Sequence, residues 1–248
     1  MTSIDLYPTL GGSDPILNNT YKDSQGKVQY VVRTPTTLTG IGRVTTIYKS
    51  KGAQVVPSQS TTSQQVDYCD DEEPAKENDN DNDRASINLD ETPAVTDTTE
   101  EVVQLEDSSM VKVGEIAWSL FKSSMITFGN KPAQEADRYF RKESWGWWGR
   151  HRAFTGPNGK EYKWVLGFYT PELIINSGTS TGTVIARFHR RKLILWNTPP
   201  GYLEIVPPAS GVVDDVPLDI DTILATFIYI EKLRGDKERS VSKTNRAF

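Results

Sequence analysis

Residues 217–234, PLDIDTILATFIYIEKLR, carry the strongest pattern in this sequence. Pro217 suits the first turn of a helix, and the aspartates that follow it are favourable beside the positive end of the helix dipole. Gly235 is a typical residue at the end of a helix. Apolar side chains between these ends cover nearly the whole circumference: Ile220, Ile223, Leu224, Ala225, Phe227, Ile228, Tyr229, Ile230 and Leu233. A helix that is apolar on every side is a buried one, so the sequence predicts a helix in the core of the protein.

The predicted helix is too short to cross a membrane, because its uncharged run, residues 222–230, is nine residues long and a span needs about 20. The first residues, MTSIDLYPTLGGSDP, do not resemble a secretory signal or a transit peptide. Cys69 is the only cysteine, which excludes an intrachain disulfide and fits a reducing compartment. We expect an intracellular protein, in the cytoplasm or peripheral to membranes, with the nucleus as an alternative and no transmembrane segment.

The charge of the chain is unevenly distributed. The net charge is −5, but residues 67–107 contain sixteen Asp and Glu against Lys76 and Arg84, a charge of −14 that leaves +9 for the remainder. Residues 51–107 also lack hydrophobic periodicity, and such a composition cannot bury enough apolar surface to offset chain entropy. We predict a disordered acidic insert, which is either a solvated spacer or a segment that docks on the basic body or on a basic partner.

Short β-type segments occur on both sides of this insert, and turn residues separate them. We predict strands at 19–22, 27–33, 43–48, 113–121, 125–128, 151–155, 160–168, 173–175, 184–188, 192–196 and 202–206, and a short helix at 134–142. Many short strands indicate a sandwich or a barrel, and a helix that is apolar all round needs an enclosure. We therefore predict a mainly β fold: a closed antiparallel barrel of 11–12 strands around the helix at 218–233. The barrel is expected to span residues 17–234, with flexible ends at 1–16 and 235–248.

Several sequence segments resemble a known family, namely RVTTIYK, GEIAWSLF, RAFTGPNGKEYKW, VIARFHRRKL and the C-terminal helix. In this order they resemble an uncharacterised domain family found mainly in mushroom-forming fungi, domain of unknown function family 6593. That family in turn is similar to the tubby C-terminal and LURP-one-related proteins, whose barrel of about twelve strands encloses a hydrophobic C-terminal helix. The resemblance covers residues 17–48 and 113–234. It implies the same fold and, through the better-known relatives, phosphoinositide binding, transcription-linked roles or membrane association.

No catalytic pattern accompanies this fold. The sequence has no GxSxG, P-loop or GxGxxG motif. His151 and His189 are each flanked by arginine, and neither has a carboxylate or cysteine at metal-ligand spacing. We therefore expect no metal site, no cofactor and no enzymatic activity.

Basic residues interleaved with tryptophan are the candidate binding site. Arginine forks suit phosphate oxygens, and tryptophan suits the wet edge of a bilayer. The lipid- or phosphate-binding candidates are Arg138, Arg141, Lys142, Arg150, Arg152, Arg190, Arg191 and Lys192, and the membrane-edge aromatics are Trp145, Trp147 and Trp148. The alternative is that these residues form an ordinary solvated surface. Nucleic acid is disfavoured because no nucleic-acid-binding motif accompanies the charge.

These observations predict a non-enzymatic intracellular binding or adaptor module that recognises anionic phospholipid headgroups through a basic and aromatic surface. The alternative is a structural or protein-interaction domain whose acidic insert mediates partner binding.

Overall fold

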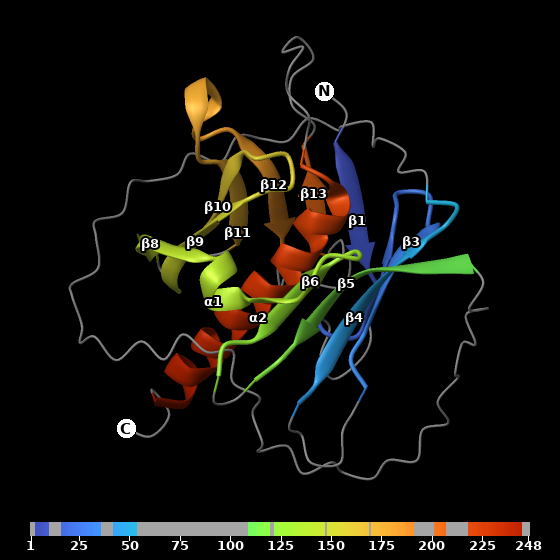
Figure 1. Cartoon of the computed structure of the whole chain (residues 1–248), viewed down its shortest axis with the longest axis horizontal. Helices are drawn as coiled ribbons and strands as arrows, with labels where there is room; N and C mark the ends of the chain where they lie inside the picture. The colour runs from blue at the N-terminus through green and yellow to red at the C-terminus, as the bar shows by residue number, and fades with distance from the viewer. Residues whose placement is uncertain are drawn as a thin grey trace, which may run out of the picture.

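The computed structural model describes residues 3–9, 16–35, 42–53, 109–119, 122–146, 148–168, 170–190, 201–206 and 218–244. The predicted acidic insert beyond Ala53 and the predicted strand at 192–196 lie outside these ranges. Strands dominate the described part of the chain (Figure 1). They are β1 (Ile4–Pro8), β2 (Asn19–Lys22), β3 (Val28–Arg33), β4 (Val44–Ser50), β5 (Met110–Ala117), β6 (Met125–Phe128), β7 (Gln134–Glu135), β8 (Arg141–Gly146), β9 (Gly149–Thr155), β10 (Glu161–Leu166), β11 (Pro171–Ile175), β12 (Val184–His189) and β13 (Tyr202–Ile205).

The thirteen strands form one antiparallel sheet with the order β7-β6-β5-β4-β3-β2-β1-β13-β12-β11-β10-β9-β8. Most neighbours in this order are also neighbours in sequence, as expected for hairpins with short turns. The N-terminal strands β1 to β4 are placed between β5 and β13. Val44 pairs with Ala117 at one junction, and Ile4 pairs with Ile205 at the other. The mainly β class is confirmed, and among the described residues three strands, β1, β7 and β8, were not predicted from the sequence.

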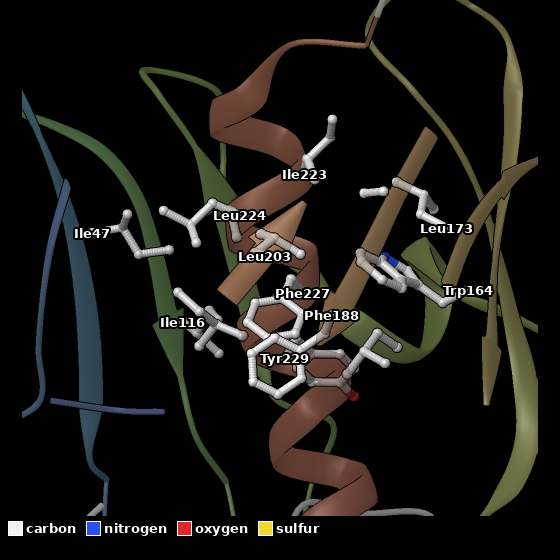
Figure 2. Close-up of a cluster of buried hydrophobic side chains, with 14 of the residues drawn as sticks. Ile47, Ile116, Trp164, Leu173, Phe188, Leu203, Ile223, Leu224, Phe227 and Tyr229 are labelled. Atoms are coloured by element: carbon white, nitrogen blue, oxygen red, sulfur yellow. The ribbon is translucent and has the colours of Figure 1, made fainter. Parts of the chain in front are cut away.

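Helix α2 (Ile220–Thr244) occupies the core, and strands lie on both sides of it (Figure 1). Every residue from 222 to 234 is buried, which confirms the predicted buried helix. Phe227 lies in the buried part of the helix, and its ring centroid is 4.9 Å from that of Phe188 and 6.1 Å from that of Trp164 (Figure 2). The Trp164 indole N–H donates a 3.1 Å hydrogen bond to the Thr226 hydroxyl, so the polar edge of this buried ring is satisfied.

The helix is longer than predicted, because it passes through Gly235 and continues to Thr244. Two ion pairs between residues four positions apart span the glycine: Lys232 Nζ lies 2.6 Å from Asp236 Oδ1, and Arg234 Nη1 lies 3.2 Å from Glu238 Oε2. A glycine inside a helix costs about 1 kcal/mol relative to alanine. The surrounding pairs and the burial of the helix outweigh that cost.

The closed barrel was a wrong prediction, because β7 and β8 are the two ends of the strand order and do not pair with each other. The predicted helix at 134–142 was also largely wrong, since these residues form β7, the four-residue helix α1 (Ala136–Tyr139) and the start of β8. Side chains from α1 and the residue after it fill the seam between the two edges. The Tyr139 ring lies 5.0 Å from Phe128 of β6 and 5.4 Å from Phe154 of β9, and buried Phe140 stacks 5.0 Å from Tyr229 of α2.

Within the ranges that the structure describes, neither helix combines the length and the apolar character needed to traverse a bilayer.

Candidate functional site

One end of the sheet exposes several aromatic rings, from the end of β8, the turn between β8 and β9 and the turn after β10. Trp145 is 53% exposed and Phe168 is 46% exposed. The Trp148 indole N–H donates a 2.7 Å hydrogen bond to the Phe168 carbonyl, and the two rings stack at 6.2 Å. Gly146, between Trp145 and the β8–β9 turn, lies so close to the end of β10 that a Cβ there would be 2.5 Å from the Leu166 carbonyl oxygen. We refer to Trp145, Trp148 and Phe168 as the aromatic end.

The predicted basic residues of β8 and β9 are divided between the two faces of the sheet. Arg152 is opposite Trp164, which is fully buried beside α2, so Arg152 lies on the inner face. Lys142 is opposite Arg152 and shares that face. Arg150 is two positions from Arg152 along the strand, so it also points inward, opposite Trp145. Arg141 is opposite Ala153, which places it on the outer face.

Arg141 is engaged in a network of carboxylates on the outer face. Its guanidinium lies 2.8 Å from Glu143 Oε1 and 2.5 Å from Glu161 Oε1. Lys163 Nζ lies 3.5 Å from the other oxygen of Glu143. Burial raises the pKa of Glu143, but Arg141 and Lys163 outweigh it, so the net shift of this pKa is downward. The charge of Arg141 is therefore largely compensated within the protein.

The two arginines on the inner face differ in exposure. Arg152 is only 4% exposed, and its guanidinium donates to the Arg150 carbonyl. Arg150 is half-buried, and its Nε donates a 3.1 Å hydrogen bond to the Glu143 carbonyl. Among the described residues, no carboxylate forms an ion pair with Arg150. Arg150 is therefore the predicted cation beside the aromatic end whose charge is least compensated.

The remaining predicted residues lie elsewhere. Arg190 follows β12, which β10 and β11 separate from β9, and its guanidinium lies 3.1 Å from Glu238 Oε2 on α2. Arg138 is exposed on α1, at the seam. Arg191, Lys192 and Trp147 lie outside the described residues. The structure thus brings Trp145, Trp148 and Arg150 together and does not place Arg138 or Arg190 with them.

A groove lies in the seam, where α2 begins. It consists of two adjoining cavities of about 660 Å³ and 340 Å³, which share Phe128, Lys131, Pro157 and Thr222 as lining residues. Asp219 and Asp221 line the larger cavity, and Arg138 and Tyr139 line the smaller one. We call these two cavities together the seam groove. Burial and the nearby Asp219 carboxylate raise the pKa of Tyr139, which keeps its hydroxyl protonated.

The sequence did not point to the seam groove. Lys131 lies between the predicted strand at 125–128 and the predicted helix at 134–142 and was not among the candidate residues, yet it lines both cavities. The groove is assembled from the β6–β7 turn, α1, the β9–β10 turn and the start of α2, segments that are far apart in the chain. It could have been identified only by knowing that the sheet is open at the seam, which the sequence did not show.

Both histidines take part in separate local contacts. The backbone N–H of Leu166 donates a 3.1 Å hydrogen bond to His151 Nδ1, and His189 Nε2 lies 2.7 Å from Glu204 Oε2. No group of three or more His, Cys, Asp or Glu side chains in the described ranges is arranged to hold a metal ion.

The fold defines a class of domain in which an antiparallel sheet surrounds one buried C-terminal helix. The chain belongs to the Family of unknown function (DUF6593), whose model matches residues 81–236, more than half of the 248 residues. This match confirms the predicted family. Strands β1 to β4 lie outside the matched range, although they complete the same sheet. No match was found among curated proteins or among solved structures.

Proposed function

We propose that this chain is a non-enzymatic binding module that recognises anionic phospholipid headgroups with its aromatic end and Arg150. The observation that carries the proposal is the exposure of Trp145 and Phe168, 53% and 46%, at one end of the sheet. Exposed large apolar side chains that gather at one place are typical of interaction sites. An indole or phenyl ring beside a cation suits the boundary between headgroups and acyl chains.

The energies expected from these groups are modest. Burying one large apolar side chain contributes about 1.5–3 kcal/mol, and a Lys or Arg near an anionic membrane surface contributes about 1 kcal/mol. Two rings and Arg150 together therefore contribute at most about 4–7 kcal/mol, which corresponds to affinities between millimolar and about ten micromolar. Binding of this strength should be reversible, and the contribution of Arg150 should make it dependent on anionic lipid and weakened by salt.

Fewer residues are proposed to bind the headgroup than the sequence predicted. Arg141 and Arg190 are paired with carboxylates, and Arg152 is buried, so they are poorly placed to bind a headgroup. As a further part of the proposal, we relate the chain to the tubby C-terminal and LURP-one-related proteins. The common feature is a hydrophobic C-terminal helix inside an antiparallel sheet, an analogy of fold that by itself carries little functional weight.

Flotation of the full chain with vesicles tests this function. Vesicles of phosphatidylcholine alone are compared with vesicles that also contain phosphoinositides, at low and high salt. We expect flotation only with the anionic vesicles, reduced by high salt, and reduced several-fold by Arg150→Glu and by the double variant Trp145→Ala with Phe168→Ala.

Two matched variants serve as controls. Val111→Ala removes a side chain that is 46% exposed on β5, and Lys122→Glu reverses an exposed cation outside the aromatic end. Both should float like the unaltered protein. Equal flotation of the aromatic-end variants and these controls, or no flotation under any condition, would contradict the proposal.

A further inference from the structure

We propose that the seam groove binds the acidic segment of the same chain, residues 67–107. The groove contains two cations whose charges are not compensated by the described residues. Lys131 and Arg138 are exposed, and neither side chain has a hydrogen bond or an ion pair with another described residue. By contrast, Arg141, Arg187 and Arg190 each lie within ion-pair distance of a carboxylate.

The carboxylates that line the groove already have partners. Asp221 Oδ1 lies 2.9 Å from Lys49 Nζ and accepts a 2.6 Å hydrogen bond from the Tyr30 hydroxyl. Asp219 Oδ2 accepts hydrogen bonds from the backbone N–H and the hydroxyl of Thr222, at 3.1 and 3.0 Å, as a cap at the positive end of α2. The charge of Asp221 is therefore neutralised by a lysine, and that of Asp219 is opposed by the helix terminus. The groove retains two cations that can accept an acidic occupant.

The acidic segment is attached beside this groove. The described chain stops at Ala53, four residues after Lys49, and resumes at Ser109, four residues before Val113. Lys49 is bonded to a lining residue of the groove, and Val113 is itself a lining residue. An extended chain advances about 3.4 Å per residue, so Ser109 lies within about 14 Å of Val113. Glu106 and Asp107 directly precede this attachment point.

Because the acidic segment belongs to the same chain as the groove, a weak interaction between them is sufficient for the groove to be occupied. A ligand joined to its site by a short linker has an effective concentration in the millimolar range. The segment provides sixteen acidic residues against two basic ones, so many alternative pairings can occupy the two cations. Because such pairs are exposed, screening by salt should release them. This inference concerns residues other than the aromatic end and does not depend on lipid binding.

Carbodiimide coupling of the full chain, followed by mass spectrometry, tests the inference. The reagent joins a lysine amine to a carboxylate only where the two are in contact. We expect Lys131 to be joined to peptides from residues 67–107 several-fold more often than Lys122. Lys122 is also exposed but lies at the opposite end of the β5–β6 hairpin. In about 1 M salt, where the screening length falls to about 3 Å, the preference should disappear.

The variant Arg138→Glu should lower the yield at Lys131 several-fold, whereas Lys122→Glu should leave it unchanged. An unaltered circular dichroism spectrum and unfolding midpoint would show that both variants retain the fold. Equal coupling of Lys131 and Lys122, or no effect of Arg138→Glu, would overturn the inference. Mixing of isotope-labelled and unlabelled chains identifies the source of the occupant, and coupling only between different chains would also overturn it.

Discussion

Arg234 and Glu231 form a two-point ion pair inside the sheet. Arg234 Nε donates to Glu231 Oε2 and Nη2 donates to Oε1, each at 2.6 Å. The two side chains are 1% and 5% exposed. Burial lowers the pKa of Arg234, but Glu231 and Glu238 outweigh it, and the net shift of this pKa is upward. Both charges have been removed from water, so each of them depends on the other.

We predict that Arg234→Met destabilises the protein by about 3–5 kcal/mol, because it leaves Glu231 buried without its counter-charge. The double variant Arg234→Met with Glu231→Leu should cost less than the sum of the two single variants. Urea unfolding measures each free energy. Arg190→Met is the matched control, since Arg190 pairs with Glu238 at the surface and should contribute at most about 1 kcal/mol. Equal costs for the two arginine variants would refute the prediction.

Phe227→Ala is expected to cost about 3–5 kcal/mol, as observed for aromatic residues removed from packed cores. The Phe227 side chain is fully buried between the rings of Phe188 and Trp164. Val241→Ala on the exposed end of the same helix should change stability by less than about 0.5 kcal/mol. Guanidinium unfolding can compare the two, and a loss below about 1 kcal/mol at Phe227 would place α2 on the surface.

We predict that the free energy of unfolding decreases as the pH is lowered, because His151 becomes protonated. Burial lowers the pKa of His151 below its usual 6.5, and Lys163 and Arg152 lower it further against the opposing effect of Glu143. Its Nδ1 accepts the Leu166 N–H, which a proton on that nitrogen would prevent. Since the unfolded chain binds this proton more readily, the contribution is complete above about pH 6.5 and is lost as pH falls through the folded-state pKa.

The measurement for His151 is the free energy of unfolding between about pH 7.5 and pH 5, compared with that of His151→Asn. The asparagine oxygen can still accept the hydrogen bond but does not titrate in this range. The variant should lose less stability than the unaltered protein over this interval. Parallel pH profiles would exclude His151 as the source of the dependence.

The sequence predicted best those helices and strands whose own residue pattern determines their structure. The apolar circumference of residues 220–233 predicted a buried helix, and the strands predicted at 151–155 and 160–168 correspond to β9 and β10. The end of α2 was missed because the pairs Lys232–Asp236 and Arg234–Glu238 outweigh the propensity of Gly235. That balance depends on burial, which the local pattern does not show.

The open seam and the candidate sites depend on contacts between distant segments. Tyr139 and Phe140 fill the seam by packing against aromatic rings on β6, β9 and α2. No local pattern could therefore indicate that β7 and β8 do not pair with each other. The run of arginines was visible in the sequence, but their partners were not. The alternation of β8 and β9 directed Arg141 to one face and Arg152 to the other, and Lys131 acquired its neighbours only through the fold.

The placement of β1 to β4 has a consequence for how this family is studied. A fragment produced from the matched range alone, residues 81–236, would begin after the four strands that connect β5 to β13. The edges of β5 and β13 would then expose unpaired backbone groups, and such edges favour aggregation. The buried face of α2 would lose part of its cover at the same time. The folding unit of this protein is therefore larger than its most recognisable sequence, and expression of the domain should start at its first strand.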